Sequence, residues 1–98
     1  MHARIGRITF SPDKAEETTN NVKQNVVPRL EQQDGFKGFT LLIDRSSGEG
    51  LGISFWESEE ALLATDSLAD EVRGKVAESV EGSDQGKTNY EVTLDTMA

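Results

Sequence analysis

The chain has 98 residues, a length typical of one small domain, and its 18 acidic and 10 basic residues give a formal net charge of −8. This acidic balance disfavours nucleic acids and anionic membrane surfaces as partners, because both are bound mainly through lysine and arginine. The absence of cysteine excludes disulfides, thiolate metal sites and a cysteine nucleophile.

No segment of the sequence predicts a membrane span or an export signal. The first ten residues, MHARIGRITF, lack the small-residue cleavage pattern of a signal peptide. No apolar stretch approaches the roughly 20 residues that cross a bilayer. We therefore expect a cytoplasmic protein whose residues 1–98 form a single domain.

The chain is predicted to begin with a strand and a long helix. Residues 3–10 (ARIGRITF) have the β-branched and aromatic content of a strand. Ser11 is placed to be the N-cap of the helix, and Pro12 suits its first turn. Pro28 lacks a backbone donor and predicts a kink one residue before it, with the helix ending by residues 34–35. The apolar face of this helix recurs at spacings of three and four residues, at Ala15, Thr18, Val22, Val26 and Leu30.

A hairpin and a second helix are predicted to follow. Residues 36–44 (FKGFTLLID) and 51–56 (LGISFW) are apolar runs joined by a short Ser/Gly turn, the pattern of a β-hairpin. Ser58 is placed to cap a helix that opens with two glutamates and runs to about residue 80. Residues 81–87 are rich in turn formers and predict a loop, and residues 88–95 (TNYEVTLD) alternate as a last strand.

The predicted order of elements is β-α-β-β-α-β, the pattern of a ferredoxin-like α+β fold. In that fold, one four-stranded antiparallel sheet carries both helices on one face. The hairpin strands are nevertheless apolar in both directions, so the second face of the sheet also needs a cover. A partner's sheet is the simplest cover, and we therefore predict a homodimer in which two sheets form an α/β barrel.

Several polar motifs are better explained as ordinary surface. GSDQGKT (82–88) has three residues between its glycines, where a phosphate-binding loop has four, and it leads into a strand. His2, the only histidine, lies at the start of the chain, where residues are often poorly ordered, so we do not expect it to act as a catalytic base or a ligand. Asp66 and Asp70 share a helix face with no histidine beside them, which favours a solvated acidic face over a metal site.

Three arginines lie on or beside predicted strands, namely Arg4, Arg7 and Arg45. A buried arginine can anchor an anionic substrate through paired hydrogen bonds. Salt bridges at a strand edge or interface are the commoner outcome, and we favour them here.

Trp56, the only tryptophan, ends the second hairpin strand in the run GISFWESEEAL. Strand alternation places it on one face with Ser54 and Gly52, while Leu51, Ile53 and Phe55 point to the other face. Small residues beside a large indole leave space, to which Gly6 on the first strand would add. If this face meets the helices, we expect a substrate pocket formed by Trp56, Ser54, Gly52 and Gly6. The alternative is that Trp56 packs under the second helix.

With this element order and the runs GFKGFTLLIDR and LGISFWESEEAL, nearly the whole chain resembles the antibiotic biosynthesis monooxygenase-like domains of the dimeric α/β-barrel superfamily. The resemblance implies paired sheets and a cavity between each sheet and its own helices. Some members of this group oxygenate polycyclic aromatic compounds without a metal or an organic cofactor, others degrade haem, and many have no known activity.

The haem-degrading branch is similar at GRITF and FWESEEAL, and it uses an asparagine, a tryptophan and a histidine. Trp56 matches that tryptophan, but Gly6 stands at the asparagine position and the histidine position falls near Asp66. With no imidazole there, haem has no evident axial ligand. We therefore expect no cofactor.

The sequence supports two functional hypotheses. The first is a cofactor-independent monooxygenase of the antibiotic-biosynthesis type that acts on a small aromatic compound, although the sequence offers no convincing catalytic base. The second is a non-catalytic dimeric module of the same fold that binds a small apolar ligand or mediates interaction. Fold alone does not decide between them.

Overall fold

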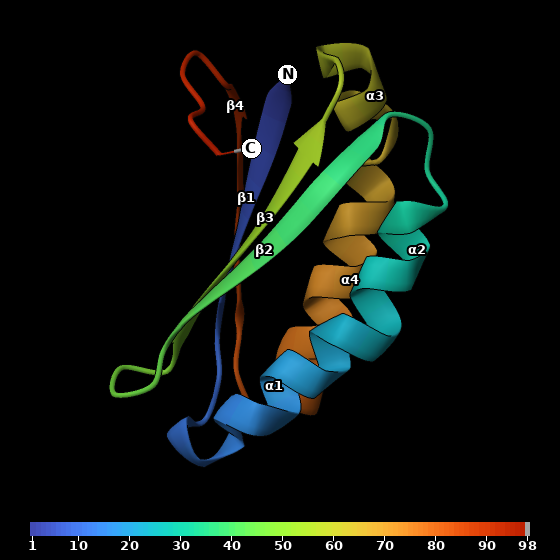
Figure 1. The fold of residues 1–98 in the computed structure, drawn as a ribbon. Helices are drawn as coiled ribbons and strands as arrows, with labels where there is room; N and C mark the ends of the chain where they lie inside the picture. The colour runs from blue at the N-terminus through green and yellow to red at the C-terminus, as the bar shows by residue number, and fades with distance from the viewer. Residues whose placement is uncertain (98) are drawn as a thin grey trace.

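A computed structural model describes residues 1–97, which form one antiparallel sheet with all helices against one of its faces (Figure 1). The strands are β1 (His2–Thr9), β2 (Phe36–Asp44), β3 (Glu49–Trp56) and β4 (Asp84–Glu91). The helical segments are η1 (Pro12–Lys14), α1 (Ala15–Asn21), η2 (Val22–Val26), α2 (Val27–Glu31), α3 (Glu59–Ala64) and α4 (Asp66–Ser79).

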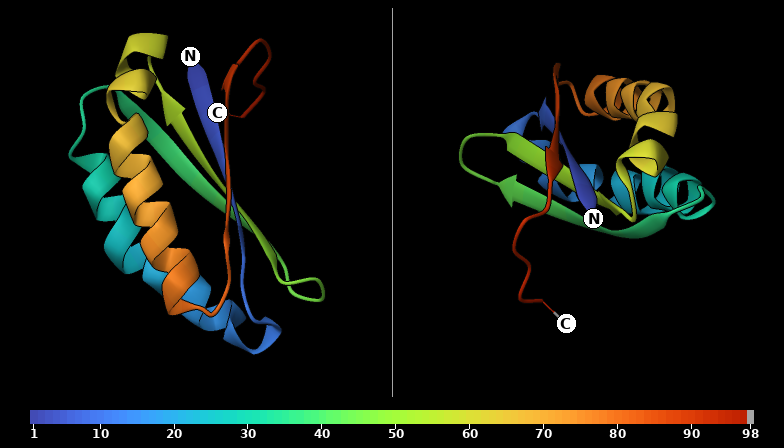
Figure 2. Two further views of the ribbon diagram at one scale, coloured as in Figure 1. Left: turned by 180° about the vertical axis from the view of Figure 1, so that it is seen from behind. Right: turned by 90° about the horizontal axis from the view of Figure 1, so that it is seen from above.

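The strand order is β2-β3-β1-β4, and all neighbouring strands are antiparallel. The two views of Figure 2 show the helical layer on one side of the twisted sheet and no helix on the other side. This arrangement confirms the predicted ferredoxin-like α+β fold. Within residues 1–97, no helix is both long enough and apolar enough to cross a membrane.

The first helical stretch contains the irregularity that Pro28 predicts. Residues 22–26 form a π turn, in which the amide of Val27 donates to the carbonyl of Val22, five residues earlier. Because Pro28 has no N–H and its ring crowds the carbonyl four residues before it, a regular α-helix is disfavoured at this point. Ser11 occupies the N-cap position of η1 as predicted, but its hydroxyl bonds to Asp13 and not to a helix amide.

The second helical stretch differs from the single helix that the sequence predicts. Ser58 caps α3 as expected, with its Oγ 3.1 Å from the amide of Ala61. The helix then breaks at Thr65, which separates α3 from α4. The hydroxyl of Thr65 donates to the carbonyl of Leu62 at 2.8 Å, a local bond that competes with helix continuation.

The last strand also starts earlier than predicted. β4 covers residues 84–91, so part of the expected 81–87 loop is strand and residues 92–95 lie beyond it. A bulge on β4, where Gln85 and Gly86 lie opposite the single residue Arg7 of β1, and a positive φ of 87° at Gly86 accommodate the early start. Backbone pairing to β1 thus outweighs the weak strand propensity of the Asp, Gly and Asn residues in this segment.

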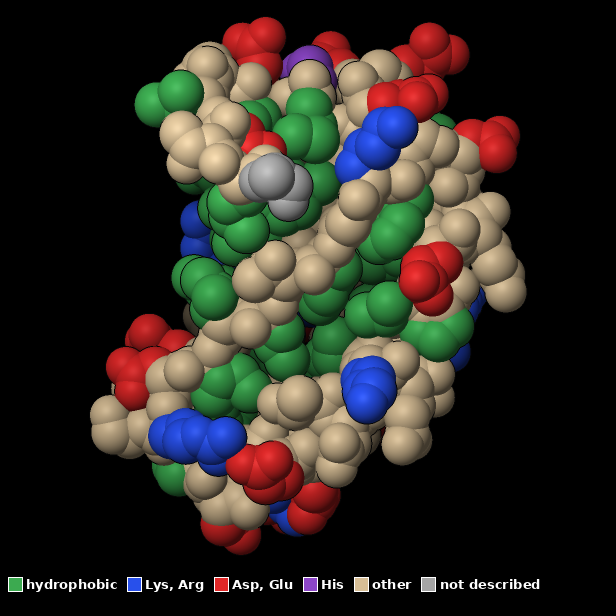
Figure 3. Space-filling view, in the orientation of Figure 1, with side chains coloured by type: hydrophobic (Ala, Val, Ile, Leu, Met, Phe, Trp, Pro, Cys, Tyr) green, Lys and Arg blue, Asp and Glu red, His purple; other side chains and the backbone are tan. Residues whose placement is uncertain are grey.

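The sheet face opposite the helices is apolar and uncovered. Its centre is formed by half-buried side chains of β1 and β3, and the more exposed Leu42 and Tyr90, each 47% exposed, flank them. Figure 3 shows hydrophobic side chains gathered across the strands with acidic side chains around the rim. The central members of this open face are Ile5, Leu51, Ile53 and Phe55.

Candidate functional site

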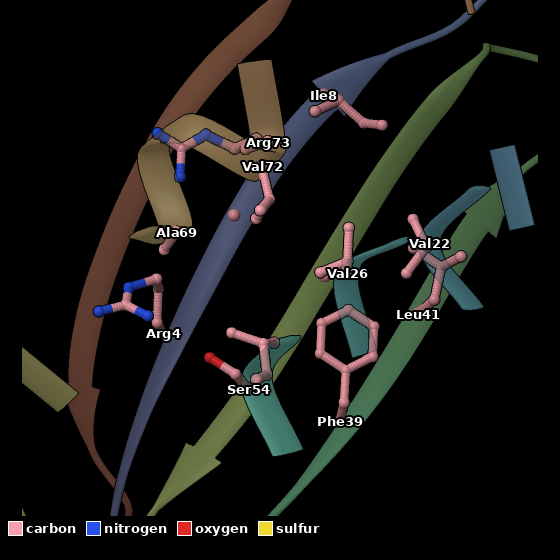
Figure 4. Close-up of a pocket in the computed structure, with 13 residues that line it drawn as sticks. Arg4, Ile8, Val22, Val26, Phe39, Leu41, Ser54, Ala69, Val72 and Arg73 are labelled. Atoms are coloured by element: carbon pink, nitrogen blue, oxygen red, sulfur yellow. The ribbon is translucent and has the colours of Figure 1, made fainter. Parts of the chain in front are cut away.

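A cavity lies between the sheet and the helices, and two cross-strand rows of side chains form its floor (Figure 4). One row is Leu41, Gly52 and Gly6, and the other is Phe39, Ser54 and Arg4, each taken across β2, β3 and β1. Gly6 and Gly52 face each other in the register of β1 and β3. Because neither has a side chain, the sheet surface is hollow at this pair.

Helical residues form the roof of the cavity. The first helical stretch contributes Val22 and Val26 of the π turn together with Leu30 of α2. The second stretch contributes Ala69, Val72 and Arg73, all from α4. The walls are therefore mostly aliphatic, with Arg4, Arg73 and Ser54 as the polar groups, which is the usual composition of a small-ligand pocket.

The cavity has a volume of about 70 Å³ and is partly open to the surface. This exceeds the roughly 10–15 Å³ that one buried water needs, but it is smaller than the cavity of about 150 Å³ that accepts benzene in an engineered protein. A ligand with an aromatic ring must therefore extend through the open side or move the walls.

Trp56 lies next to this cavity but not in its wall. Its side chain is fully buried at 0% exposure, its ring packs edge-on against Phe36 with centroids 5.5 Å apart, and its Nε1 donates to Ser54 Oγ at 2.9 Å. Of the four predicted site residues, the structure places Gly6, Gly52 and Ser54 in the wall and Trp56 behind Ser54. The indole is thus linked to the cavity wall by its hydrogen bond to that serine.

Arg4 joins the sheet to the break between α3 and α4. Its Nη2 donates to the carbonyl of Leu62 at 2.7 Å and to the carboxylate of Asp66, and its Nη1 donates to the hydroxyl of Thr65 at 3.2 Å. The carbonyl of Leu62 lies at the end of α3, where cations are favoured by the helix dipole. Arg4 is only 3% exposed, and its Nε has no hydrogen-bond partner among residues 1–97. A buried unpaired donor of this kind costs about 1–3 kcal/mol.

Two of the three strand arginines form salt bridges, but the bridge of Arg4 is buried on the central strand β1 and not at a strand edge as predicted. Arg4 pairs with Asp66, and Arg45 Nη1 lies 2.7 Å from a glutamate of α1. Arg7 instead donates to the hydroxyl of Thr88 at 3.0 Å. Only Arg4 of the three also lines the cavity.

A network of two cations and two carboxylates edges the cavity. Arg73 donates to Asp84 at 2.6 Å and to Asp70 at 2.7 Å, and Lys87 Nζ lies 2.8 Å from Asp70. Hydrogen bonds from Lys87 and Arg73 lower the pKa of Asp70. At Asp84, burial raises the pKa, but hydrogen bonds from Arg73 and the amide of Gly86 outweigh it, and the pKa is lowered.

These lowered pKa values predict acid-dependent stability. Because the carboxyls bind protons more weakly in the folded chain, their contribution is complete above about pH 4 and is lost as the pH falls through the folded values. We expect Asp70→Asn to lower the free energy of unfolding modestly at pH 7, since Asp70 is half exposed. Urea denaturation at stepped pH should show the difference between variant and parent shrinking below about pH 4. A difference that stays constant down to pH 2 contradicts this assignment.

Arg73 was not singled out from the sequence. A signal was present, because Arg73 follows Val72 and lies four residues after Ala69 and three before Val76, so it interrupts the apolar stripe of the helix. Gly6 explains why the stem of Arg73 enters the cavity, since a Cβ at Gly6 would lie 3.3 Å from Arg73 Cδ.

The cavity wall does not fit haem. Within residues 1–97 it contains no histidine, cysteine, methionine or tyrosine to serve as an axial ligand. His2 lies outside the wall, with its Nε2 3.8 Å from Glu59 Oε2. Asp66 stands near the position that the resemblance assigns to a histidine, and its carboxylate is engaged by Arg4.

Comparison with known proteins identifies relatives of the whole fold. A sequence profile of the antibiotic biosynthesis monooxygenase family matches residues 1–70. The uncharacterized Mycobacterium tuberculosis proteins Rv2557 and Rv2558 are 31% and 32% identical over 83 residues, or 85% of this chain. The matched segment covers 37% of the first and 35% of the second, so the chain spans little more than a third of the length of these relatives.

Solved structures share the fold at low sequence identity. A monooxygenase from the Streptomyces coelicolor gene ActVA-Orf6, in complex with nanaomycin D, has a TM-score of 0.69 at 14% identity, over 99% of this chain and 92% of that chain. The heme-degrader MhuD of M. tuberculosis, with two hemes bound, has a TM-score of 0.70 at 24% identity, over 99% and 100% of the two chains. Identities this low establish a common fold, but they do not show that this chain binds the ligands of those proteins.

Proposed function

Because the chain belongs to the antibiotic biosynthesis monooxygenase family, we propose that it is a cofactor-independent monooxygenase that oxidises a small aromatic compound in the cavity beside Ser54. One observation carries the proposal. A largely aliphatic cavity between the sheet and the helices has Arg4 and Ser54 together on its floor. Such a wall can exclude water from a ring while polar groups orient its oxygen substituent.

The proposed reaction uses the substrate itself as reductant. An activated methylene beside an aromatic ketone or phenol loses two hydrogens and gains one oxygen atom of O₂ as a carbonyl. The other oxygen atom leaves as water, so all four electrons come from the substrate. The protein's part is to hold the ring, exclude water and stabilise the deprotonated substrate that reacts with O₂.

Each predicted site residue has a distinct part in this proposal. Gly6 and Gly52 leave room for the ring, and Ser54 contacts its oxygen. Trp56 acts as a positioning residue, because its Nε1 fixes the hydroxyl oxygen of Ser54. Through this hydrogen bond, the buried indole of Trp56 would orient a residue that contacts the substrate.

We also propose that residues 1–98 form one domain that works as half of a homodimer. The open face formed by Ile5, Leu51, Ile53 and Phe55 supports this, because a second sheet would remove those side chains from water. An isologous sheet-to-sheet contact would place the two cavities on opposite outer sides of the paired sheets.

A second candidate function has one specific observation in its favour. Among residues 1–97, the cavity wall contains no carboxylate and no imidazole, so no general base faces a substrate. A non-catalytic module that binds the same kind of ligand would need no base. Under the oxygenase proposal, the substrate must instead be acidic enough to ionise once its oxygen is bound.

Oxygen consumption distinguishes the two functions. We expect the protein without any added cofactor to consume one O₂ per molecule of an anthrone or a related hydroxylated polycyclic compound, at a rate well above the spontaneous reaction. The measurement is an oxygen-electrode assay across a panel of such compounds, with product identified by mass. Saturable ligand binding with no oxygen uptake across the panel would favour the binding module.

A further inference from the structure

Arg4 and Ser54 form a buried pair of hydrogen-bond donors on the floor of the cavity. They are direct partners in the register of β1 and β3, and both face the helices. Their exposed fractions are 3% and 4%. Figure 4 shows the two side chains at the same end of the cavity, with the aliphatic side chains of Val22 and Leu41 at the other end.

One hydrogen-bond donor of Arg4, the Nε–H, has no partner within residues 1–97. The two Nη atoms reach Leu62, Thr65 and Asp66, which fixes the guanidinium in place. The Nε–H has no acceptor among the described residues and is closed to water. Most buried polar atoms in proteins have a hydrogen-bond partner. The unpaired Nε–H of Arg4 can therefore bind an acceptor from a ligand.

The hydroxyl of Ser54 accepts one hydrogen bond but donates none within residues 1–97. Its Oγ accepts from Trp56 Nε1 at 2.9 Å, so the oxygen is oriented and its own hydrogen remains available. Because a hydroxyl that accepts a hydrogen bond becomes a better donor, Trp56 prepares Ser54 to donate into the cavity.

We propose that Arg4 Nε–H and Ser54 Oγ–H together bind the oxygen of an aromatic phenolate or enolate. This rests on the proposed function, because it names the ionised form of the ligand that the cavity would take. Arginine stays protonated, and hydrogen bonds from a charged donor to an anionic oxygen are stronger than neutral ones. Two fixed donors that bind an oxyanion also lower the free energy of the ionised substrate. This helps the substrate to ionise in a cavity whose wall contains no general base.

The volume of the cavity fits this assignment. A ring-bearing ligand is too large for the cavity of about 70 Å³ unless a wall moves, and binding as proposed requires that the same movement uncover the buried Nε–H of Arg4. Asp66 pairs with Nη2 of the guanidinium and keeps it from turning away. The ligand oxygen would thus complete the hydrogen bonding of Arg4 without displacing any existing partner.

Matched aromatic probes test the inference without any oxygen chemistry. 4-Nitrophenol ionises to a yellow phenolate, and 4-nitroanisole has the same ring and nitro group but no ionisable hydroxyl. Binding is followed by quenching of the single tryptophan, Trp56, and the ionisation of bound nitrophenol by its absorbance. We expect nitrophenol to bind more tightly as the pH rises through its ionisation, while nitroanisole binding stays flat.

The variant Ser54→Ala should weaken nitrophenolate binding about tenfold, the loss expected for one hydrogen bond to a charged group, and nitroanisole binding less than about twofold. Arg4→Lys should have a similar selective effect, because lysine keeps the charge but lacks the Nε–H. Far-UV circular dichroism establishes that each variant is folded. If neither variant folds, the pH dependence of the two probes on the parent protein still decides.

Two results would overturn the inference: nitrophenol that binds only as the neutral phenol, or equal losses for both probes in the variants. Failure of both probes to bind would overturn it together with the ligand-binding part of the proposed function. Selective phenolate binding in a protein that consumes no oxygen would support the donor pair and refute the oxygenase.

Discussion

Replacing Trp56 with alanine is expected to remove about 3–5 kcal/mol from the free energy of unfolding, the usual loss for a buried aromatic side chain. Trp56 is fully buried and is the largest side chain with no exposed surface. The change leaves a cavity beside Phe36 and removes the donor that orients Ser54. The free energy of unfolding of a domain of this size is small, so much of the variant should be unfolded at 37 °C.

Trp56→Phe is the matched control, because it keeps an aromatic ring but removes the N–H. We expect a smaller loss, about 1–2 kcal/mol, from the missing hydrogen bond and the reduced ring size. Urea denaturation must be followed by far-UV circular dichroism, since these variants lack the only tryptophan. A loss below about 1 kcal/mol for Trp56→Ala would mean that the indole is not part of the core.

Placing a charge on the open face is expected to convert a homodimer into single chains. Ile53 lies at the centre of that face, between Leu51 and Phe55 on β3 and beside Ile5 on β1. In Ile53→Glu, association would bury an unpaired carboxylate, which costs several kilocalories per mole and exceeds what one apolar contact contributes. Each dimer has two symmetric copies of the site, so the effect is doubled.

Sedimentation equilibrium at micromolar concentration measures this directly. The parent protein should have twice the chain mass of 10.7 kDa, and Ile53→Glu should have the mass of one chain. Thr19→Glu adds the same charge at an exposed position of α1 and should remain dimeric. A parent protein that sediments at the mass of one chain would refute the pairing of the open faces.

Much of the fold could be predicted because strong local signals agree with it. The hairpin strands, the cap at Ser58 and the irregularity before Pro28 all follow from residue chemistry that acts over a few positions. The break at Thr65 and the early start of β4 could not be predicted in this way. At Thr65 the bonds of Arg4 to the end of α3 add to the local bond of the Thr65 hydroxyl, and the early start of β4 depends on its pairing with β1.

The candidate site was only partly visible in the sequence. Period-two alternation places Ser54 and Gly52 together, and the register then sets Gly52 opposite Gly6. Alternation carries no information on depth, so it could not show that Trp56 lies behind Ser54. The sequence allows Arg4 to be either an anion-binding arginine or part of an edge salt bridge, and we favour the salt bridge from the sequence alone. The unpaired Nε–H of Arg4 depends on the positions of all the partners of its guanidinium, which the sequence does not show.

The most direct test of the cavity as the place of reaction is oxygen uptake after the cavity has been filled. Ala69 lines it from α4, whereas Ala64 is exposed on α3, so the same change at both positions compares a blocked cavity with an intact one. With an anthrone as substrate, Ala69→Leu should reduce oxygen uptake by at least about tenfold, because even small displacements of a bound substrate are costly. Ala64→Leu should retain the parent rate. Equal rates in the parent and both variants would contradict the proposal that the reaction takes place beside Ser54.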